Sequence, residues 1–273
     1  MKNIADKTIQ LHDGRTLGYA EYGSLAGKPL LYFHGHPGSR LEAKFLANEA
    51  LNDGIRLVGI DRPGMGLSTY KPRRNLLDWV NDVVELANSL QIDRFSIGGY
   101  SGGGPYALAC AYKIPNRLIS CGIVSGVGHT SLFLSFLSRR SPWLILPITK
   151  RFSQKTARAS QRWVEPDQNA LLVPEVAEIM SASLVEAIKQ GTKGAAYNGT
   201  LIGSRNWGFR LEDITFSNLY IWHGERDTQI PVETVRTLVK RLPTCETTYF
   251  PNEGHISLIV NRTKDIINTL TRM

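Results

Sequence analysis

The strongest candidate for chemistry is a serine within a glycine-rich stretch, GGYSGGGP, at residues 98–105. The pattern Gly99-x-Ser101-x-Gly103 follows an apolar run and precedes a helical one, which predicts a sharp strand-to-helix turn with Ser101 at its tip. Side chains two positions before or after that serine would collide with the neighbouring strand and helix, so glycine suits positions 99 and 103. The amides that open the following helix would face an oxyanion forming beside the serine. We therefore interpret Ser101 as a candidate nucleophile.

Two other interpretations of this stretch stay open. The serine could be idle in a tight turn, or the glycines could form a nucleotide-binding loop. Only the relaxed pattern G-x-G-x-x-A fits such a loop, at Gly102, Gly104 and Ala107, with no acid before Glu165 to hold a ribose. There is also no Gly-Lys-Ser/Thr of a P-loop, so phosphate binding is the weaker hypothesis.

A serine hydroxyl needs a base to remove its proton and a carboxylate to orient that base. His255 follows a β-like run at 247–250 and precedes a helical pattern, while Asp227 follows a strand that ends at His223. Since parallel strands end at one edge of a sheet, we expect Asp227 and His255 to meet the serine there. Serine, acid and histidine follow in that order with spacings of 126 and 28 residues. Glu225 is the rival acid, and His223 is expected to be structural.

The histidines His34 and His36 have a spacing that also occurs in zinc sites. No acid and no further histidine follows before Glu42, and a zinc site needs at least three protein ligands. We therefore expect no metal at this pair.

Alternating apolar and helical segments predict the fold. Two short strands are expected at 8–11 and 16–22, and the Asp-Gly turn between them predicts a hairpin. Continuous apolar runs, without alternating polar residues, predict parallel strands that are buried on both faces. Segments with the apolar periodicity of a helix separate these runs. The expected strands are 29–33, 55–60, 95–98, 118–124 and 216–222, and the expected helices are 41–52, 76–90 and 105–112. The fold class is therefore α/β, with a doubly wound, mostly parallel sheet.

The strand-helix alternation fails between about residues 128 and 211, where the patterns are helical. We expect residues 1–128 and 212–273 to form the core and residues 129–211 to form an inserted helical lid. Apolar segments of the lid, including 132–137 and 143–146, are expected to roof an apolar pocket or simply to pack on the core.

The chain carries a net charge of +8, and residues 94–164 hold ten lysines and arginines but no acid. These basic residues stand singly or in pairs, so we expect no nucleic-acid partner, although a basic surface that binds nucleic acid or anionic membrane is a third hypothesis. The most apolar stretch, 131–148, contains two arginines and two prolines, which argues against a membrane span.

The sequence does not determine the oligomeric state of the protein.

The cellular location is expected to be the cytoplasm. Residues 1–15 carry scattered charges and no apolar core of a secretory signal. Three cysteines, Cys110, Cys121 and Cys245, lack the C-x-x-C spacing of zinc or redox motifs. Reduced, mostly buried thiols in a soluble protein are therefore expected.

Four motifs, in the right order along essentially the whole chain, resemble those of the α/β-hydrolase superfamily. In chain order they are Asp61-x-x-Gly-x-Gly-x-Ser68, the serine turn, the strand end His223-Gly-x-x-Asp227, and Gly254-His255 before the last helical segment. The resemblance implies Ser101 as nucleophile, Asp227 as acid and His255 as base, with no cofactor. Asp61 is expected to be structural and to accept hydrogen bonds from its own turn.

The loop after the third strand, His34-Gly-His36-Pro37-Gly, resembles the HG-x-P-G form of epoxide-hydrolase and proline-iminopeptidase relatives. This resemblance implies that the main-chain amides of His36 and Gly102 bind the oxyanion, since Pro37 has no amide to donate. His34 is expected to be structural, and the side chain of His36 at most shapes the pocket. Serine in place of an aspartate nucleophile argues against an epoxide hydrolase, and departures from HGGPG and GGSWG make peptidase activity doubtful.

The leading functional hypothesis is a serine hydrolase that cleaves a small, apolar carboxylic ester through an acyl-enzyme. Amide or C–C bond hydrolysis is a variant that the same three side chains would support. A second hypothesis is a small-molecule receptor on the same scaffold, with little or no turnover.

Overall fold

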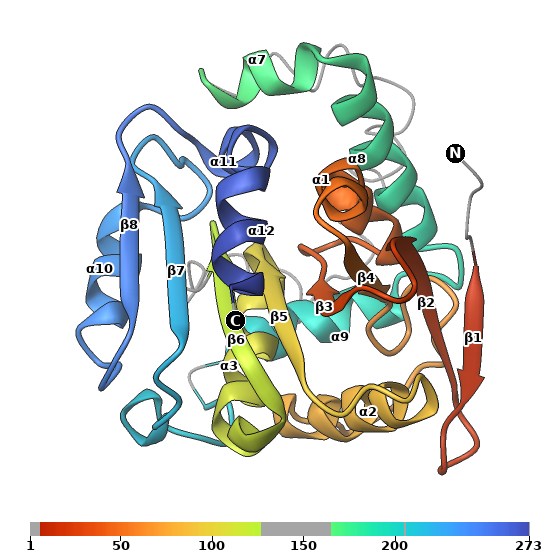
Figure 1. Cartoon of the computed structure of the whole chain (residues 1–273). Coiled ribbons are helices and arrows are strands. Elements are labelled where there is room, and N and C mark those ends of the chain that lie inside the picture. Colours follow the sequence, from red (N-terminus) through yellow and green to blue (C-terminus); the bar gives the residue numbers. More distant parts are fainter. Residues whose placement is uncertain (1–5, 127–164, 205, 273) are drawn as a thin grey trace.

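The computed structural model describes residues 6–126, 165–204 and 206–272 (Figure 1). Its centre is an eight-stranded sheet in the order β1-β2-β4-β3-β5-β6-β7-β8. The strands are β1 (Lys7–Gln10), β2 (Thr16–Gly23), β3 (Lys28–Phe33), β4 (Ile55–Ile60), β5 (Phe95–Tyr100), β6 (Leu118–Val124), β7 (Leu219–Gly224) and β8 (Glu246–Phe250). The predicted α/β class with a mostly parallel sheet is confirmed.

The first two strands form the antiparallel hairpin expected from the Asp-Gly turn, with Lys7 opposite Tyr19. Gly14 has a φ of +80° there, a conformation that glycine adopts without steric cost. Strand β2 also pairs antiparallel with β4, and every other pairing in the sheet is parallel. The hairpin therefore forms one edge of the sheet, and the parallel strands form its centre.

One strand begins later than the sequence indicates. The expected strand 216–222 is β7, Leu219–Gly224. Ser217 and Asn218 are exposed to solvent, whereas pairing with β8 continues to Gly224 opposite Phe250. The expected strand 95–98 likewise extends to Tyr100, because β5 pairs with β6 up to that residue.

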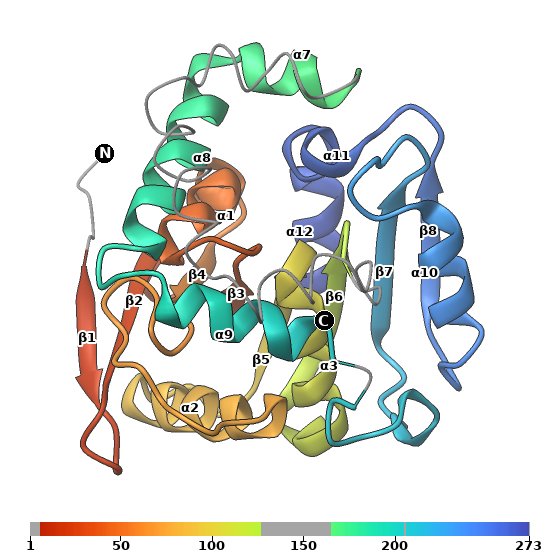
Figure 2. The ribbon, with the colours of Figure 1, turned by 180° about the vertical axis from the view of Figure 1, so that it is seen from behind.

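Helices cover both faces of the sheet, as a doubly wound fold requires (Figures 1 and 2). On one face α2 (Leu76–Ser89), α3 (Gly104–Lys113) and α10 (Val232–Val239) share an apolar core with the strands. On the other face lie α1 (Ala47–Asn52), α11 (His255–Asn261) and α12 (Thr263–Thr271). The expected helix 41–52 is a 3₁₀ helix, η1 (Arg40–Leu46), followed by α1, since the Glu42 amide bonds the carbonyl of Ser39 three residues back.

Three helices of the segment between β6 and β7 are described. They are α7 (Asp167–Leu172), α8 (Pro174–Ala187) and α9 (Lys193–Ile202). Helix α7 packs on α11, at the top of Figure 1, and α8 packs on η1. The segments 132–137 and 143–146 lie outside the described residues, so the division into core and lid stays a prediction.

Within the described ranges, no helix has both the length and the apolar character needed to cross a membrane. All three cysteines lie in these ranges and none forms a disulfide; Cys110 and Cys121 are buried and Cys245 is partly exposed.

Candidate active site

Ser101 lies on a sharp turn between β5 and α3. Its φ is +48°, in the left-handed region that a side chain other than glycine rarely adopts. A Cβ at Gly99 would lie 2.8 Å from the carbonyl oxygen of Gly103, and a Cβ at Gly103 would lie 2.1 Å from that of Phe33. The two glycines are therefore required by close backbone approach, as the sequence pattern predicts, and Ser101 stays partly exposed.

His255 joins Ser101 to Asp227 through both ring nitrogens. Its Nε2 lies 2.9 Å from Ser101 Oγ, and its Nδ1 lies 2.7 Å from Asp227 Oδ2. The other carboxylate oxygen, Oδ1, accepts hydrogen bonds from the amides of Gln229 and Ile230, each at 2.8 Å. Because Asp227 Oδ2 accepts a hydrogen bond from Nδ1–H, Nε2 has a lone pair toward the serine.

The two neighbouring candidates on the β7 loop have other partners. Glu225 is exposed and pairs with Arg236 at 2.8 Å. His223 is buried, and its Nε2–H donates to the carbonyl of Ile230 at 2.9 Å. Burial lowers the pKa of His223, partly opposed by nearby Asp227, so this imidazole is held neutral behind the acid. Its structural role matches the expectation from the sequence.

The loop after β3 lies against the serine turn. A Cβ at Gly102 would lie 2.6 Å from His36 Cβ and 3.2 Å from the His36 main-chain nitrogen. The His36 ring lies near α9, because a Cβ at Gly199 would be 3.1 Å from its Nε2. Burial, with a smaller contribution from Arg62, lowers the pKa of His36 to about 3, so the ring is neutral at ordinary pH.

His34 uses both ring nitrogens within the fold. Its Nδ1–H donates to the carbonyl of Gly35 at 2.8 Å, and its Nε2 faces the amide of Arg62 at 3.4 Å. The side chain is fully buried, which lowers the pKa of His34 well below its usual value. Among the described residues, no group of three or more His, Cys, Asp or Glu side chains could hold a metal ion.

The sequence of residues 30–267 matches the profile of the alpha/beta hydrolase family. This chain belongs to the alpha/beta hydrolase family. The expected resemblance is thereby confirmed, and family membership supports an enzyme of this class.

Several known proteins resemble this hydrolase. A proline iminopeptidase from Clostridium botulinum is 30% identical over 47% of this chain and 47% of its own length. Lipase 1 from Psychrobacter immobilis is 24% identical over 93% of this chain and 79% of its own length. An esterase from Exiguobacterium antarcticum has the same fold, with a TM-score of 0.76 at 18% identity over 98% of this chain and 100% of that one. The chain spans 31% and 47% of the length of two of the curated relatives that it matches.

Two buried polar side chains, Arg62 and Glu42, hold the main chain of this hydrolase beside the serine turn. Arg62 donates from Nη1 to the carbonyl of His34 at 2.5 Å and from Nη2 to that of Gly35 at 2.6 Å. Glu42 accepts the amide of Gly35 at 2.6 Å and the hydroxyl of Tyr32 at 3.1 Å. Burial raises the pKa of Glu42 to about 7 and lowers that of Arg62 to about 10. Neither residue was predicted from the sequence, although Arg62 adjoins the motif residue Asp61.

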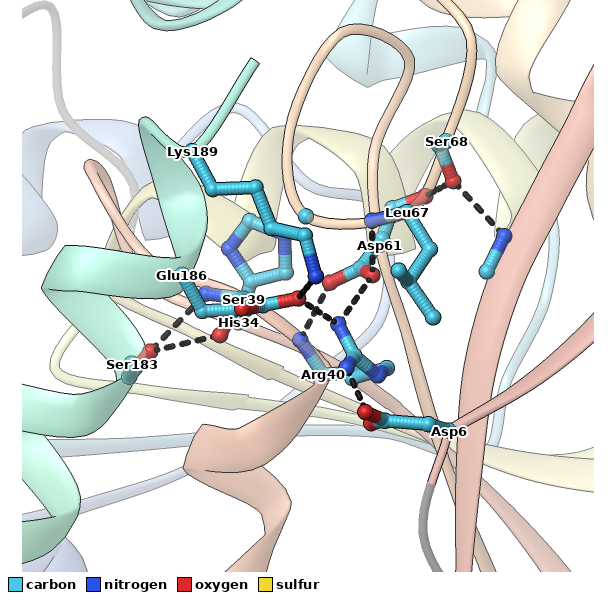
Figure 3. A network of polar contacts seen from close by, with 12 residues as sticks. Asp6, His34, Ser39, Arg40, Asp61, Leu67, Ser68, Ser183, Glu186 and Lys189 are labelled. Atoms are coloured by element: carbon cyan, nitrogen blue, oxygen red, sulfur yellow. Dashed lines mark hydrogen bonds and ion pairs between the residues drawn. The ribbon is translucent and has the colours of Figure 1, made fainter. Parts of the chain in front are cut away.

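Asp61 of the hydrolase has more partners than its own turn supplies. The amide of Leu67 donates to Oδ2 at 2.9 Å, as expected, but the buried Arg40 also pairs with Oδ2 at 2.8 Å. The main-chain amide of Arg40 donates to Oδ1 at 2.7 Å. Figure 3 shows that Glu186 from α8 contacts the same guanidinium, at 2.7 Å. The interpretation of Asp61 as a turn residue was therefore incomplete, since the sequence gives no sign of the long-range ion pair.

Helix α8 is also attached to the loop after β3 through Ser183, whose Oγ accepts the amide of Ser39 at 2.8 Å (Figure 3). A third contact comes from Gln190, whose side-chain amide donates to the carbonyl of Gly66 at 2.5 Å. These polar contacts bind part of the segment between β6 and β7 directly to η1 and to the loops that follow β3 and β4.

Proposed function

We propose that this chain is a serine hydrolase that cleaves a small carboxylic ester through an acyl-enzyme. The observation that carries the proposal is the continuous hydrogen-bonded chain from Ser101 Oγ through His255 to Asp227. Family membership supports hydrolysis in general. The three side chains come from loops far apart in the sequence and meet at one edge of the sheet, where ligands bind in open α/β folds.

In the proposed reaction, Ser101 Oγ attacks the ester carbonyl while Nε2 of His255 takes the hydroxyl proton. Asp227, which accepts the Nδ1–H, stabilises the imidazolium that forms. The main-chain amides of His36 and Gly102 are the proposed donors to the oxyanion. His255 then protonates the leaving alcohol, and a water molecule activated by the same histidine releases the acid from Ser101. The reaction needs only this chain and water.

A small, apolar ester is the substrate class that we propose. Ile202 of α9 lies beside the serine turn, since a Cβ at Gly102 would be 3.1 Å from its Cδ1. That contact places an aliphatic side chain next to the proposed oxyanion donors, which favours an apolar acyl or alcohol group. Relatives named as a lipase and an esterase support the ester over the amide. The relative named as an iminopeptidase makes amide cleavage the alternative.

The proposal is tested with Ser101→Ala against the wild type and the matched surface variant Ser217→Ala. Turnover of p-nitrophenyl esters of graded acyl length and labelling by a fluorophosphonate are measured. Ser101→Ala should lose both, by about 10⁴-fold or more in turnover, whereas Ser217→Ala should keep both. Unchanged turnover in Ser101→Ala would refute the proposal. Labelling of the wild type without turnover of any ester or amide would favour a receptor on this scaffold instead.

A further inference from the structure

Asp167 makes three hydrogen bonds to the helix that begins with His255. Its Oδ2 accepts the amide of His255 at 2.8 Å, and its Oδ1 accepts those of Ile256 at 2.8 Å and Ser257 at 2.9 Å. The residue is 1% exposed and opens α7, in the segment between β6 and β7, 88 residues before the histidine in the chain. This segment therefore contacts the main chain of the proposed base through the side chain of Asp167.

Helix α11 has no side chain at its own start that could make these bonds. The first amides of a helix lack partners within the helix, and the residue before it normally supplies a side-chain oxygen. Here that residue is Gly254, which has no side chain. Ser257 Oγ accepts only the Gly254 amide, at 2.8 Å. The carboxylate of Asp167 fills this role from another part of the fold, and its charge suits the positive end of the helix.

The glycine before the histidine leaves the space that the carboxylate occupies. A Cβ at Gly254 would lie 2.5 Å from Asp167 Oδ1 and 2.7 Å from Oδ2. Any larger residue would therefore displace Asp167 from the start of α11. This contact gives a physical reason for the Gly254-His255 pair that the sequence analysis singled out.

His255 is held at several points at once. Asp167 binds its amide, the hydroxyl of Tyr100 donates to its carbonyl at 3.3 Å, and Asp227 binds Nδ1 of its ring. Ring orientation depends on all of these contacts because the imidazole must stay between Ser101 and Asp227. A displacement of about 1 Å in a catalytic group can cost on the order of a hundredfold in rate.

We propose, resting on the function proposed above, that Asp167 is a positioning residue for His255. Its carboxylate fixes the first turn of α11 so that the imidazole faces Ser101, which makes the segment between β6 and β7 part of the machinery for acyl transfer. The side chain contacts neither Ser101 nor the reacting atoms, and acts through the main chain of His255.

Two substitutions separate positioning from folding. Asp167→Asn keeps one acceptor oxygen, which can hold the amides of Ile256 and Ser257, but it places an NH₂ group against the amide of His255. Asp167→Ala removes every acceptor. Glu165→Gln is the matched control, because Glu165 is exposed on the same segment and the change removes the same charge.

The readouts are kcat and KM on an ester substrate, the rate of fluorophosphonate labelling, thermal melting, and the low-field proton resonance of His255 Nδ1–H. Asp167→Asn should melt near the wild type, with kcat and labelling rate about tenfold lower and KM within about twofold. The low-field resonance should broaden or shift. Asp167→Ala should lose about a hundredfold in kcat, and Glu165→Gln should match the wild type in every readout.

A wild-type kcat and an unchanged resonance in Asp167→Asn would overturn the inference. An equal loss in Glu165→Gln would overturn it too, since a general charge effect would then suffice. The proposed function is tested separately by Ser101→Ala. If that function is wrong, Ser101→Ala keeps its ester turnover, whatever the result for Asp167→Asn.

Discussion

Arg62 Nη2 donates to the carbonyl oxygen of Gly35, and that carbonyl belongs to the same peptide group as the amide of His36. A peptide group is planar and trans, so fixing its oxygen also fixes the direction of its N–H. A charged donor on the oxygen further polarises the amide. Arg62 therefore sets the direction of the amide that we propose as an oxyanion donor.

Arg62→Lys should lower kcat by about tenfold with little change in KM, because a lysine cannot donate in the same fork to two carbonyls. Arg94→Lys is the control, since Arg94 donates to the carbonyl of Leu118 away from the site. Steady-state kinetics on one p-nitrophenyl ester and thermal melting measure both variants. Equal kcat values in a folded Arg62→Lys and the wild type would contradict the prediction.

Glu42 should make the stability of the fold depend on pH. Burial raises the pKa of Glu42 from the ordinary 4.5 to about 7, so between these values the folded state holds a proton that the unfolded state has lost. The free energy of unfolding should therefore fall by about 3 kcal/mol as pH rises through this window, and level off above it.

The comparison with Glu42→Gln isolates that effect. His34, His36 and His223 have lowered pKa values and change stability in the opposite sense, but they do so in both proteins. Urea denaturation from pH 4.5 to 8 should show the wild type losing stability relative to Glu42→Gln up to about pH 7. A difference that stays constant with pH would disprove the assignment.

His36 and His255 should respond differently to loss of the imidazole. His36→Ala keeps the main-chain amide, and burial already lowers the pKa of the His36 ring to about 3, so much of the ester hydrolysis should remain. His255→Ala removes the proposed base and should lose about 10⁴-fold or more in kcat. Ester turnover across a range of pH measures both. Equal losses would mean that the His36 ring takes part in the chemistry.

Gly103 should tolerate no side chain. In Gly103→Ala the new Cβ would meet the carbonyl oxygen of Phe33 at 2.1 Å, which should destabilise the fold by about 3 kcal/mol. Gly98→Ala is the control, because its Cβ would meet nothing closer than Leu270 Cδ1 at 3.6 Å. Chemical denaturation should give a clearly lower free energy of unfolding for Gly103→Ala than for Gly98→Ala. Similar free energies of unfolding would contradict the close approach of β3 to the serine turn.

The sequence alone determined the fold class, the serine turn and the order of the candidate serine, acid and histidine. These features depend on local rules: buried parallel strands are apolar throughout, and a nucleophile on a sharp turn needs glycine where the backbone crowds. The same rules gave the wrong start for β7 and the wrong type of helix for part of residues 41–52. Both features depend on which residues are paired or buried after folding.

Only the tertiary structure decided the contacts that surround the candidate site. Asp167, Arg62, Glu42 and the pair Arg40–Asp61 are charged residues, which a sequence reading places in solvent. Their burial depends on partners that lie far away in the chain, such as Glu186 for Arg40 and the helix start at His255 for Asp167. Hydrogen bonds over such separations leave no periodic or local pattern, so only the folded chain brings these groups together.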